Sequence, residues 1–234
     1  PRILPRGDSK EAFILAAKPN PPSAPASLAT KGLPVRFIGV IPPGLEGISY
    51  TEVQTNALLT FVDQGKQWEV LNHTGDPITT ITGGAGRLIA RGLALDVVRG
   101  SKRNGVPSID IRAAQDSMAH GVGARVGFTF FPPHPEMNFL TLFNIASNGD
   151  IQYLYPLREQ DNKGVDNIGF PVQFRVSHPL GADQLVAVFC SRPPLDLQAL
   201  LGTLNGQTAP TDNHFFETLR QGNCQTGLVG LFTQ

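Results

Sequence analysis

Residues 138–155, NFLTLFNIASNGDIQYLY, decide the fold, because two apolar runs flank the tetrapeptide Ser147-Asn148-Gly149-Asp150. Asn-Gly between apolar runs is the strongest short-range signal for a β-hairpin, since both residues tolerate the positive φ angles of a two-residue turn. The flanking runs are short and rich in Phe, Leu, Ile and Tyr, which favours strands over helices. We therefore expect an antiparallel hairpin here.

Further strand-like segments lie on both sides of this hairpin. Apolar residues alternate with polar ones or form short runs at residues 109–111, 126–130, 170–176 and 185–190. Six short strands separated by Gly, Pro and Asn predict an antiparallel β-sandwich of the immunoglobulin-like type. After these strands, the sequence predicts a helix over 195–204, a second helix over 212–220 with Asp212 as its N-cap, and a last strand over 228–232.

The first half of the chain has the pattern of a small α/β layer. We expect a strand at 35–41, a helix at 49–62, a hairpin formed by 67–71 and 77–81, and a helix at 88–98. The fold class is therefore α+β. The polar break at 101–105 suggests three regions: an N-terminal segment with a Pro-rich linker (1–32), the α/β subdomain (33–103), and the sandwich with its C-terminal helices and last strand (104–234). Within the first region, the apolar residues 12–17 are expected to dock onto the body.

The composition excludes several classes of function. The 234 residues include 19 Lys+Arg and 19 Asp+Glu, and the sequence pI is about 7.4. This balance provides no electrostatic footprint for nucleic acid or for a membrane surface. The 25 Gly and 20 Pro suit many short elements joined by turns and argue against a helical bundle. No apolar run is long enough to cross a membrane, and we expect a cytoplasmic protein, or a secreted one if an upstream signal peptide has been removed.

Two cysteines leave a choice of interpretation. A Cys190–Cys224 bridge is one reading, and two reduced thiols in the cytosol are the simpler one. Cys190 ends an apolar run and is expected to be buried, whereas Cys224 lies in a polar loop and is expected to be the more exposed and reactive thiol. No His or carboxylate stands beside Cys224 in the sequence, so a catalytic role for it is the least favoured hypothesis.

No other arrangement of residues predicts catalysis. Residues 83–87, GGAGR, precede a helix as a phosphate-binding loop does, but the Lys-Ser/Thr of such a loop is missing. Glycines that open a helix after a hairpin are a sufficient structural explanation. The five His residues are scattered with no metal-ligand spacing. We therefore expect no catalytic residue, no metal and no cofactor in this chain.

Three loops are the candidate contact surfaces for a partner. They are the turn 132–136 with His134, the loop 157–168 with Arg158, Asp161 and Lys163, and residues 192–194 with Arg192. The loop 157–168 is the longest polar insert between strands, and ordinary solvated loop structure is the alternative reading for it. Tyr153 and Tyr155 are expected to share one face of their strand and to border a groove with Arg158, although core packing is the simpler role for both rings.

Several phrases of the second half resemble a known family when they are read together. They are Gly123-Ala124-Arg125-Val126, FLTLFNIA at 139–146, NGDIQYLYP at 148–156, FPVQF at 170–174, PLGADQLVAV at 179–188 and SRPPL at 191–195. Over about 105–200 the chain resembles an uncharacterised β-rich domain that lies C-terminal to the peptidase in bacterial caspase-like cysteine proteases. Residues 33–77 resemble, more weakly, the segment that bridges the peptidase and that domain.

The resemblance implies a non-catalytic role beside a peptidase. The His/Cys dyad of the family belongs to its peptidase domain, and the strand ends that carry the dyad there do not occur here, so no catalytic residue is transferred. The implied partners are a caspase-like peptidase domain, in cis or as a cleaved subunit, and a protein substrate or regulator that this region recognises. Loops rich in Pro, Gly and Asn on a rigid scaffold suit such recognition.

Two hypotheses from other classes remain open. One is a free-standing secreted β-sandwich that binds a ligand or carbohydrate, which a buried Trp in a groove and a glycan at the sequon residue Asn72 would support. The other is a structural, capsid-like β protein, in which low charge and many Phe residues would face a symmetric partner.

Overall fold

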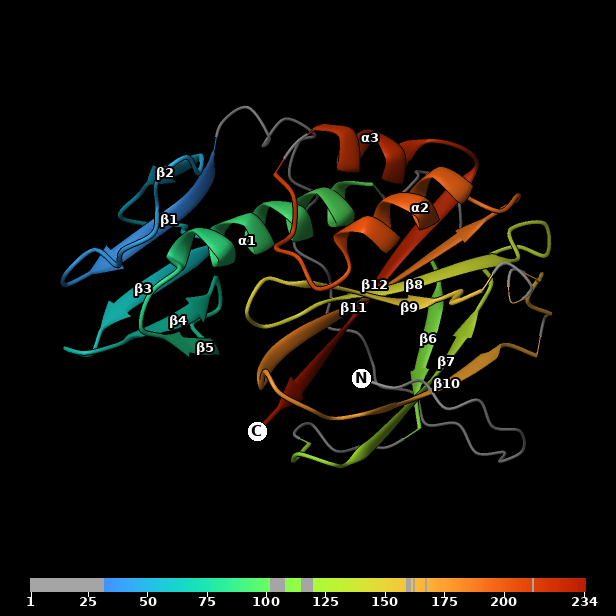
Figure 1. Cartoon of the computed structure of the whole chain (residues 1–234), viewed down its shortest axis with the longest axis horizontal. Coiled ribbons are helices and arrows are strands. Elements are labelled where there is room, and N and C mark those ends of the chain that lie inside the picture. The colour runs from blue at the N-terminus through green and yellow to red at the C-terminus, as the bar shows by residue number, and fades with distance from the viewer. Residues whose placement is uncertain are drawn as a thin grey trace.

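Three β-sheets and three helices make up the described part of the chain (Figure 1). The structure is a computed structural model that describes residues 32–101, 108–114, 120–158, 161, 163–166, 168–211 and 213–234. The expected docking segment 12–17, the linker before residue 32 and the expected N-cap Asp212 lie outside these residues. The fold is β-rich and of the α+β kind, as the sequence predicts.

The first unit is a mixed five-stranded sheet with the strand order β2-β1-β3-β4-β5. β1 pairs in parallel with β2 and β3, and the remaining pairs are antiparallel. The predicted first strand and the predicted hairpin are both confirmed. The strands are β1 (Leu33–Ile38), β2 (Tyr50–Glu52), β3 (Leu59–Asp63), β4 (Trp68–Asn72) and β5 (Pro77–Ile81).

The helix predicted at 49–62 is wrong, since β2 and β3 occupy this segment. The backbone N–H groups of Val53 and Leu58 donate to the carbonyl oxygens of Val35 and Pro34, at 2.9 and 2.8 Å, instead of to earlier residues of a helix. Asn56, with φ of 58°, breaks the segment with a left-handed turn. The apolar spacing that suggested one helical face comes from the connection between β2 and β3 and from β3 itself.

Helix α1 (Ala85–Gly100) packs against two different hydrophobic cores. Its first half, including Leu88 and Ile89, packs on the five-stranded sheet. Its second half, including Val97 and Val98, packs on the four-stranded sheet described below. The first N–H groups of the helix, on Ala85 and Gly86, donate to loop carbonyl oxygens at 3.4 and 2.8 Å. Because these donors are occupied, the glycines before α1 serve the structure and form no phosphate cradle.

The second half of the chain forms two antiparallel sheets that share a hydrophobic cluster. The orders are β10-β7-β6 and β12-β11-β8-β9. Phe128 and Phe174 from the first sheet and Leu142 and Phe189 from the second lie in this shared cluster. All the predicted strands are present, as β6 (Asp110–Ala113), β7 (Arg125–Phe131), β8 (Phe139–Ile145), β9 (Ile151–Tyr155), β10 (Phe170–Arg175), β11 (Gly181–Cys190) and β12 (Cys224–Thr233).

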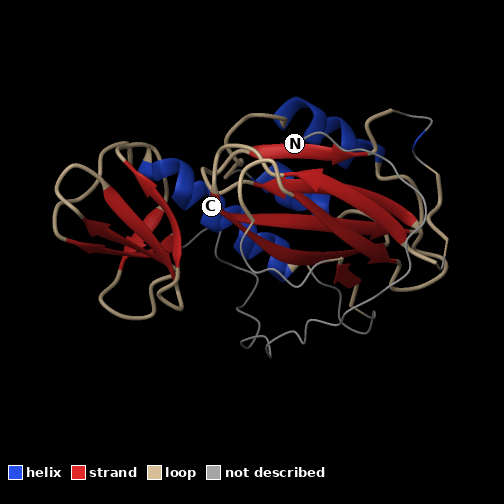
Figure 2. Ribbon diagram, turned by 90° about the horizontal axis from the view of Figure 1, so that it is seen from below, coloured by secondary structure: helices blue, strands red, loops and turns tan. Residues whose placement is uncertain are grey.

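Helices cover the other face of the four-stranded sheet. The predicted helices are present as α2 (Leu195–Leu204) and α3 (Asn213–Arg220). Together with the second half of α1 they bury that face, with Leu201 and Phe215 against Phe143 and Val186. Figure 2 shows the five-stranded sheet at one end of the molecule and the other two sheets, with their helices, at the opposite end. The layers of the second half are therefore helices, four strands and three strands.

Candidate functional site

The topology brings the three predicted contact loops to one end of the antiparallel sheets. Cys190 at the end of β11 pairs with Phe139 at the start of β8, and Phe170 at the start of β10 pairs with Phe130 near the end of β7. β9 ends beside them, at Tyr155 (Figure 1). The connections 132–138 and 191–194 and the described residues of 156–169 therefore lie at the same end of the sheets, and we call this region the loop end.

The loops at the loop end are tied by backbone hydrogen bonds. The N–H of Val165 donates to the carbonyl oxygen of Asn138 at 2.7 Å and joins the longest loop to the β7–β8 connection. The N–H of Met137 donates to His134 O at 2.9 Å, and the N–H of Ser191 donates to Asn223 O at 3.1 Å. The first of these bonds joins two of the contact loops, the second closes a turn within one loop, and the third joins residues 191–194 to the segment before β12.

The predicted polar residues lie on the surface of the loop end. His134, Arg158, Lys163 and Arg192 are exposed, and none of the four forms an ion pair with a residue that the structure describes. His134 Nδ1 accepts a hydrogen bond from the N–H of Glu136 at 3.3 Å. Exposed Arg and Lys side chains without an ion-pair partner among the described residues are available for contact with another molecule.

Tyr153 and Tyr155 do not border a common groove. Tyr153 packs on the helix-covered face of the sheet, whereas Tyr155 packs in the cluster between the two sheets. The reason is a register shift: Phe143 pairs with Tyr153 but Leu142 pairs with Tyr155, so the strict alternation of faces is lost.

The environment of the two tyrosines favours packing over chemistry. Tyr155 Oη donates to the carbonyl oxygen of the half-buried Asp161. Burial raises the pKa of Tyr153, and the neighbouring Tyr155 adds to the effect; burial and then Asp161 raise the pKa of Tyr155. Both phenols are therefore neutral at physiological pH, and core packing is the role that the structure gives them.

Apolar side chains stand in solvent beside the polar residues. The exposed fractions are 60% for Leu157, 81% for Ile168 and 63% for Leu195, the first residue of α2. Leu157, Ile168, Arg158, Lys163, Arg192 and Leu195 together form what we call the loop-end surface. Exposed aliphatic groups close in sequence to exposed charged residues are typical of contact surfaces rather than of catalytic pockets.

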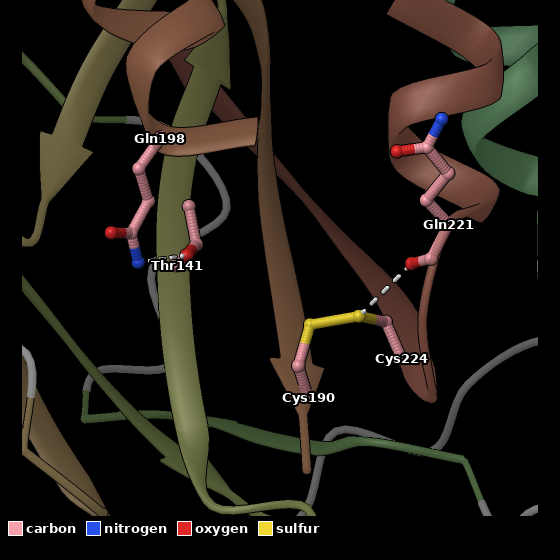
Figure 3. Close-up of a disulfide and its surroundings, with 5 residues drawn as sticks. All are labelled: Thr141, Cys190, Gln198, Gln221 and Cys224. Carbon is pink, nitrogen blue, oxygen red and sulfur yellow. Dashed lines mark hydrogen bonds between the residues drawn. A yellow bond between two sulfur atoms is a disulfide. The ribbon is translucent and has the colours of Figure 1, made fainter. Parts of the chain in front are cut away.

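A disulfide bond closes the loop end. Cys190 and Cys224 are paired residues of β11 and β12, with their sulfur atoms 2.07 Å apart and their Cα atoms 4.0 Å apart (Figure 3). The interpretation as two reduced thiols is therefore wrong, and so is the expectation of an exposed, reactive Cys224, which is buried. Its Sγ lies 3.5 Å from the carbonyl oxygen of Gln221. The sequence left the bridge open because only the β11–β12 register brings these two residues together.

A buried polar cluster lies at the opposite end of the same sheets. Arg91, at 4% exposure, reaches from α1 and donates through Nε to Ala146 O at 3.0 Å and through a terminal nitrogen to Ala182 O at 2.5 Å. The N–H of Ser147 donates to Asp183 Oδ1 at 2.7 Å. These bonds fasten α1 to the β8–β9 hairpin and to the start of β11. We call this region the joint end.

Burial dominates the electrostatics of the joint end. Desolvation lowers the pKa of Arg91 to about 10, although the Asp183 carboxylate opposes this change. Desolvation also raises the pKa of Asp183, against the opposing effects of the Ser147 N–H, Asn144 and Arg91. Arg91 and Asp183 attract each other electrostatically, but their charged atoms are not within ion-pair distance. Arg91 remains charged at neutral pH, since even its lowered pKa is well above 7.

Arg91, Asn144 and Asp183 are the residues that sequence reasoning missed. Arg91 and Asn144 interrupt apolar runs, within α1 and within β8, and Asp183 stands just ahead of the apolar end of β11. A polar side chain inside an apolar run is a signal that could have identified them, because such a group is retained only where it finds a buried partner.

No metal centre and no membrane span is found in the part of the chain that the structure describes. There, no three His, Cys, Asp or Glu residues gather closely enough to hold a metal ion. None of the three helices is long and apolar enough to span a bilayer.

Comparisons with protein-family models, with curated proteins and with solved structures found no match to this chain. The resemblance to a domain of caspase-like proteases therefore stays a prediction that the quoted residues carry.

Proposed function

We propose that this chain is the non-catalytic C-terminal part of a bacterial caspase-like cysteine protease, and that it recognises a substrate or regulatory partner for the peptidase domain. The observation that carries the proposal is the loop-end surface, where two of the loops selected from the sequence expose Leu157, Ile168 and Leu195 near charges that have no ion-pair partner among the described residues. Surfaces of this composition suit a protein partner, with apolar groups for burial and charges for orientation.

The finer fold proposal is an immunoglobulin-like sandwich. It is supported by the short antiparallel strands, by the hydrophobic cluster that the two sheets share, and by loops that gather at one end of the strands. In sandwiches of this type, end loops are a common place for recognition, because the sheets hold them in position while their sequences are free to vary.

The first test is the coding sequence upstream of Pro1. About 200 or more preceding residues with a His and Cys pair on alternating strands and helices would support the protease reading. A signal peptide directly before Pro1 would contradict it and favour an exported binding module.

The second test applies to the whole protease. We expect Ile168→Asp and Leu157→Asp to weaken cleavage of the protein substrate, or its response to a regulator, while cleavage of a short peptide stays unchanged. Val122→Asp is the matched control, because Val122 is another exposed aliphatic residue, at 59%, in the turn before β7 and away from the loop end. Equal effects of the three variants would contradict a role for the loop-end surface.

The disulfide favours a second candidate, a secreted ligand- or carbohydrate-binding protein. Stable disulfides are typical of oxidising compartments and rare in the bacterial cytosol.

The two other features named for this candidate are engaged within the chain. The side chain of the sequon residue Asn72 belongs to the turn of its own hairpin. Its Oδ1 accepts hydrogen bonds from the N–H groups of Thr74 and Asp76, each at 2.9 Å, and its Nδ2 donates to Asp76 Oδ2 at 3.3 Å. Trp68 is half-buried, and its Nε1 donates to Val40 O at 2.7 Å. An exported caspase-like protease is consistent with the disulfide as well.

A further inference from the structure

A small cavity lies between the two antiparallel sheets, beside the joint end. Its volume is about 40 Å³, and side chains from both sheets line it. Since a buried water molecule occupies about 10–15 Å³ on this measure, the cavity has room for about three groups of that size. Part of its wall is apolar, with Leu154, Phe174 and Leu185. The polar part of the wall includes the acceptor groups of Asn144 and Asp183.

Asn144 supplies the first acceptor. Its side chain lines the cavity and the residue is 6% exposed, yet Oδ1 has no hydrogen-bond partner among the residues that the structure describes. Its Nδ2 is used, since it donates to Gln152 Oε1 at 3.0 Å. A buried carbonyl oxygen without a donor is unfavourable, so a ligand that brings an N–H group to this position gains a hydrogen bond that the unliganded protein lacks.

Asp183 supplies the second acceptor and a negative charge. Its carboxylate lines the same cavity and accepts the Ser147 N–H at Oδ1. The buried cation nearby, Arg91, donates to the carbonyl oxygens of Ala146 and Ala182 and forms no close ion pair with Asp183. The Asn144 side chain is a second hydrogen-bond partner of the carboxylate. Since an ionised carboxylate has about four acceptor positions, Asp183 keeps capacity for a cationic donor.

We propose that this cavity binds a primary alkylammonium group, from the side chain of a lysine in a protein partner or from a free amine. The ammonium donates to Asn144 Oδ1 and to the Asp183 carboxylate, and the adjoining methylenes contact Leu154, Phe174 and Leu185. An ammonium group is a donor only, as two neighbouring acceptors require, and it is small enough for the space. The cavity lies at the other end of the sheets from the loop-end surface, so this inference and the proposed function can fail independently.

Arg175 also lines the cavity, and its positive charge provides a way to test whether the ligand is a cation or an anion. Its side chain is exposed and is the cation among the residues that line the cavity. It repels an alkylammonium ion weakly, because solvent screens an exposed charge, but it would attract a carboxylate or phosphate. Removal of this charge should therefore change the affinity for a cation and for an anion in opposite directions.

The test is a titration of the full chain with n-butylammonium, followed by NMR chemical shifts, with 1-butanol and butyrate as uncharged and anionic controls of the same length. We expect saturable binding of n-butylammonium in the millimolar range. Asp183→Asn should weaken it about tenfold or more, because the substitution keeps an acceptor for Ser147 but removes the charge. Asn144→Leu should abolish binding; because it also removes the Nδ2 donor of Gln152, its unfolding midpoint is measured to show that the variant is folded under the conditions of the titration. Arg175→Gln should bind as tightly as the unmodified chain or more tightly.

Three results would overturn the proposal. Equal binding of 1-butanol would identify an apolar cavity without charge recognition. Stronger binding of butyrate, lost in Arg175→Gln, would identify an anion site. Absence of saturable n-butylammonium binding would exclude the ligand class. A lysine peptide and its Nε-acetylated form then separate the two sources. If the chain binds the lysine peptide more tightly than the acetylated peptide, and Asn144→Leu removes this difference, the ligand is a lysine of a protein partner. If only the free amine binds, the cavity is a small-molecule site.

Discussion

The loop end and the joint end belong to the same two sheets and differ in what their polar groups do. At the loop end, Arg158, Lys163 and Arg192 stand in solvent, and backbone hydrogen bonds hold the loops. At the joint end, the side chains of Arg91 and Asp183 form hydrogen bonds directly with backbone groups of other segments and so hold these segments together. Substitutions at the joint end should therefore change the stability of the fold, and those on the loop-end surface should change contacts with a partner.

The disulfide lies at the loop end but stabilises the fold, so it departs from this division between the two ends. Its loss should have the largest effect on the free energy of unfolding. Cys190 and Cys224 are separated by 34 positions, and in the chain-entropy model a bridge over such a loop stabilises the fold by about 3–4 kcal/mol. Urea unfolding of the oxidised and reduced protein should show this loss. The Cys190→Ala/Cys224→Ala variant should not respond to the reductant; equal midpoints for the oxidised and reduced chain would mean that the bridge adds nothing to stability.

Arg91→Met should have the next largest effect. The methionine keeps most of the apolar packing in α1 but leaves the carbonyl oxygens of Ala146 and Ala182 without their donor. We expect the free energy of unfolding to fall by about 3 kcal/mol. The matched control is Arg87→Met, one turn earlier on the same helix, where the exposed guanidinium lies 3.7 Å from Asp150 and contributes less than about 0.5 kcal/mol. Similar losses in both variants would remove the distinction between the ends.

Gly149→Ala tests the turn of the joint-end hairpin. Gly149 has φ of 91°, and an added Cβ would lie 2.5 Å from the carbonyl oxygen of Arg87. The combination of a strained backbone and a clash with α1 should destabilise the fold by about 2–3 kcal/mol. Gly206→Ala isolates the backbone contribution, because Gly206 has φ of 79° and an added Cβ there would meet no atom within 4 Å; this variant should lose about 1 kcal/mol. A difference near zero between them would contradict the close approach of hairpin and helix.

Local patterns predicted most of the fold. The Asn-Gly turn at 148–149, the alternating strands and the helices behind them are all decided by neighbouring residues, and the structure has them where the sequence places them. The segment 49–62 failed because its apolar spacing fits one helix as well as two short strands. Only the bonds of Val53 and Leu58 to β1 distinguish the two, and these depend on a distant part of the chain.

The candidate site shows the same limit. Sequence reasoning identified the three loops separately, and their meeting at one end follows from strand order and register, which no local pattern contains. The pairing of Cys190 with Cys224 and the contact of Arg91 with the β8–β9 hairpin also depend on pairing between distant segments. The error on Tyr153 and Tyr155 came from assuming strict alternation, which the register shift between Leu142 and Phe143 breaks.

The smallest expected effect on stability belongs to Ile168→Asp. The side chain is 81% exposed, and the residue is held through its backbone N–H, which donates to Asp166 Oδ1 at 3.1 Å. We expect the free energy of unfolding to change by less than about 0.5 kcal/mol. Val165→Asp, three residues earlier in the same loop, replaces a side chain that is 7% exposed and should be strongly destabilising. If urea unfolding showed the same loss of stability for both variants, Ile168 would belong to the core and not to a contact surface. A clear difference would place the boundary between core and contact surface within this one loop.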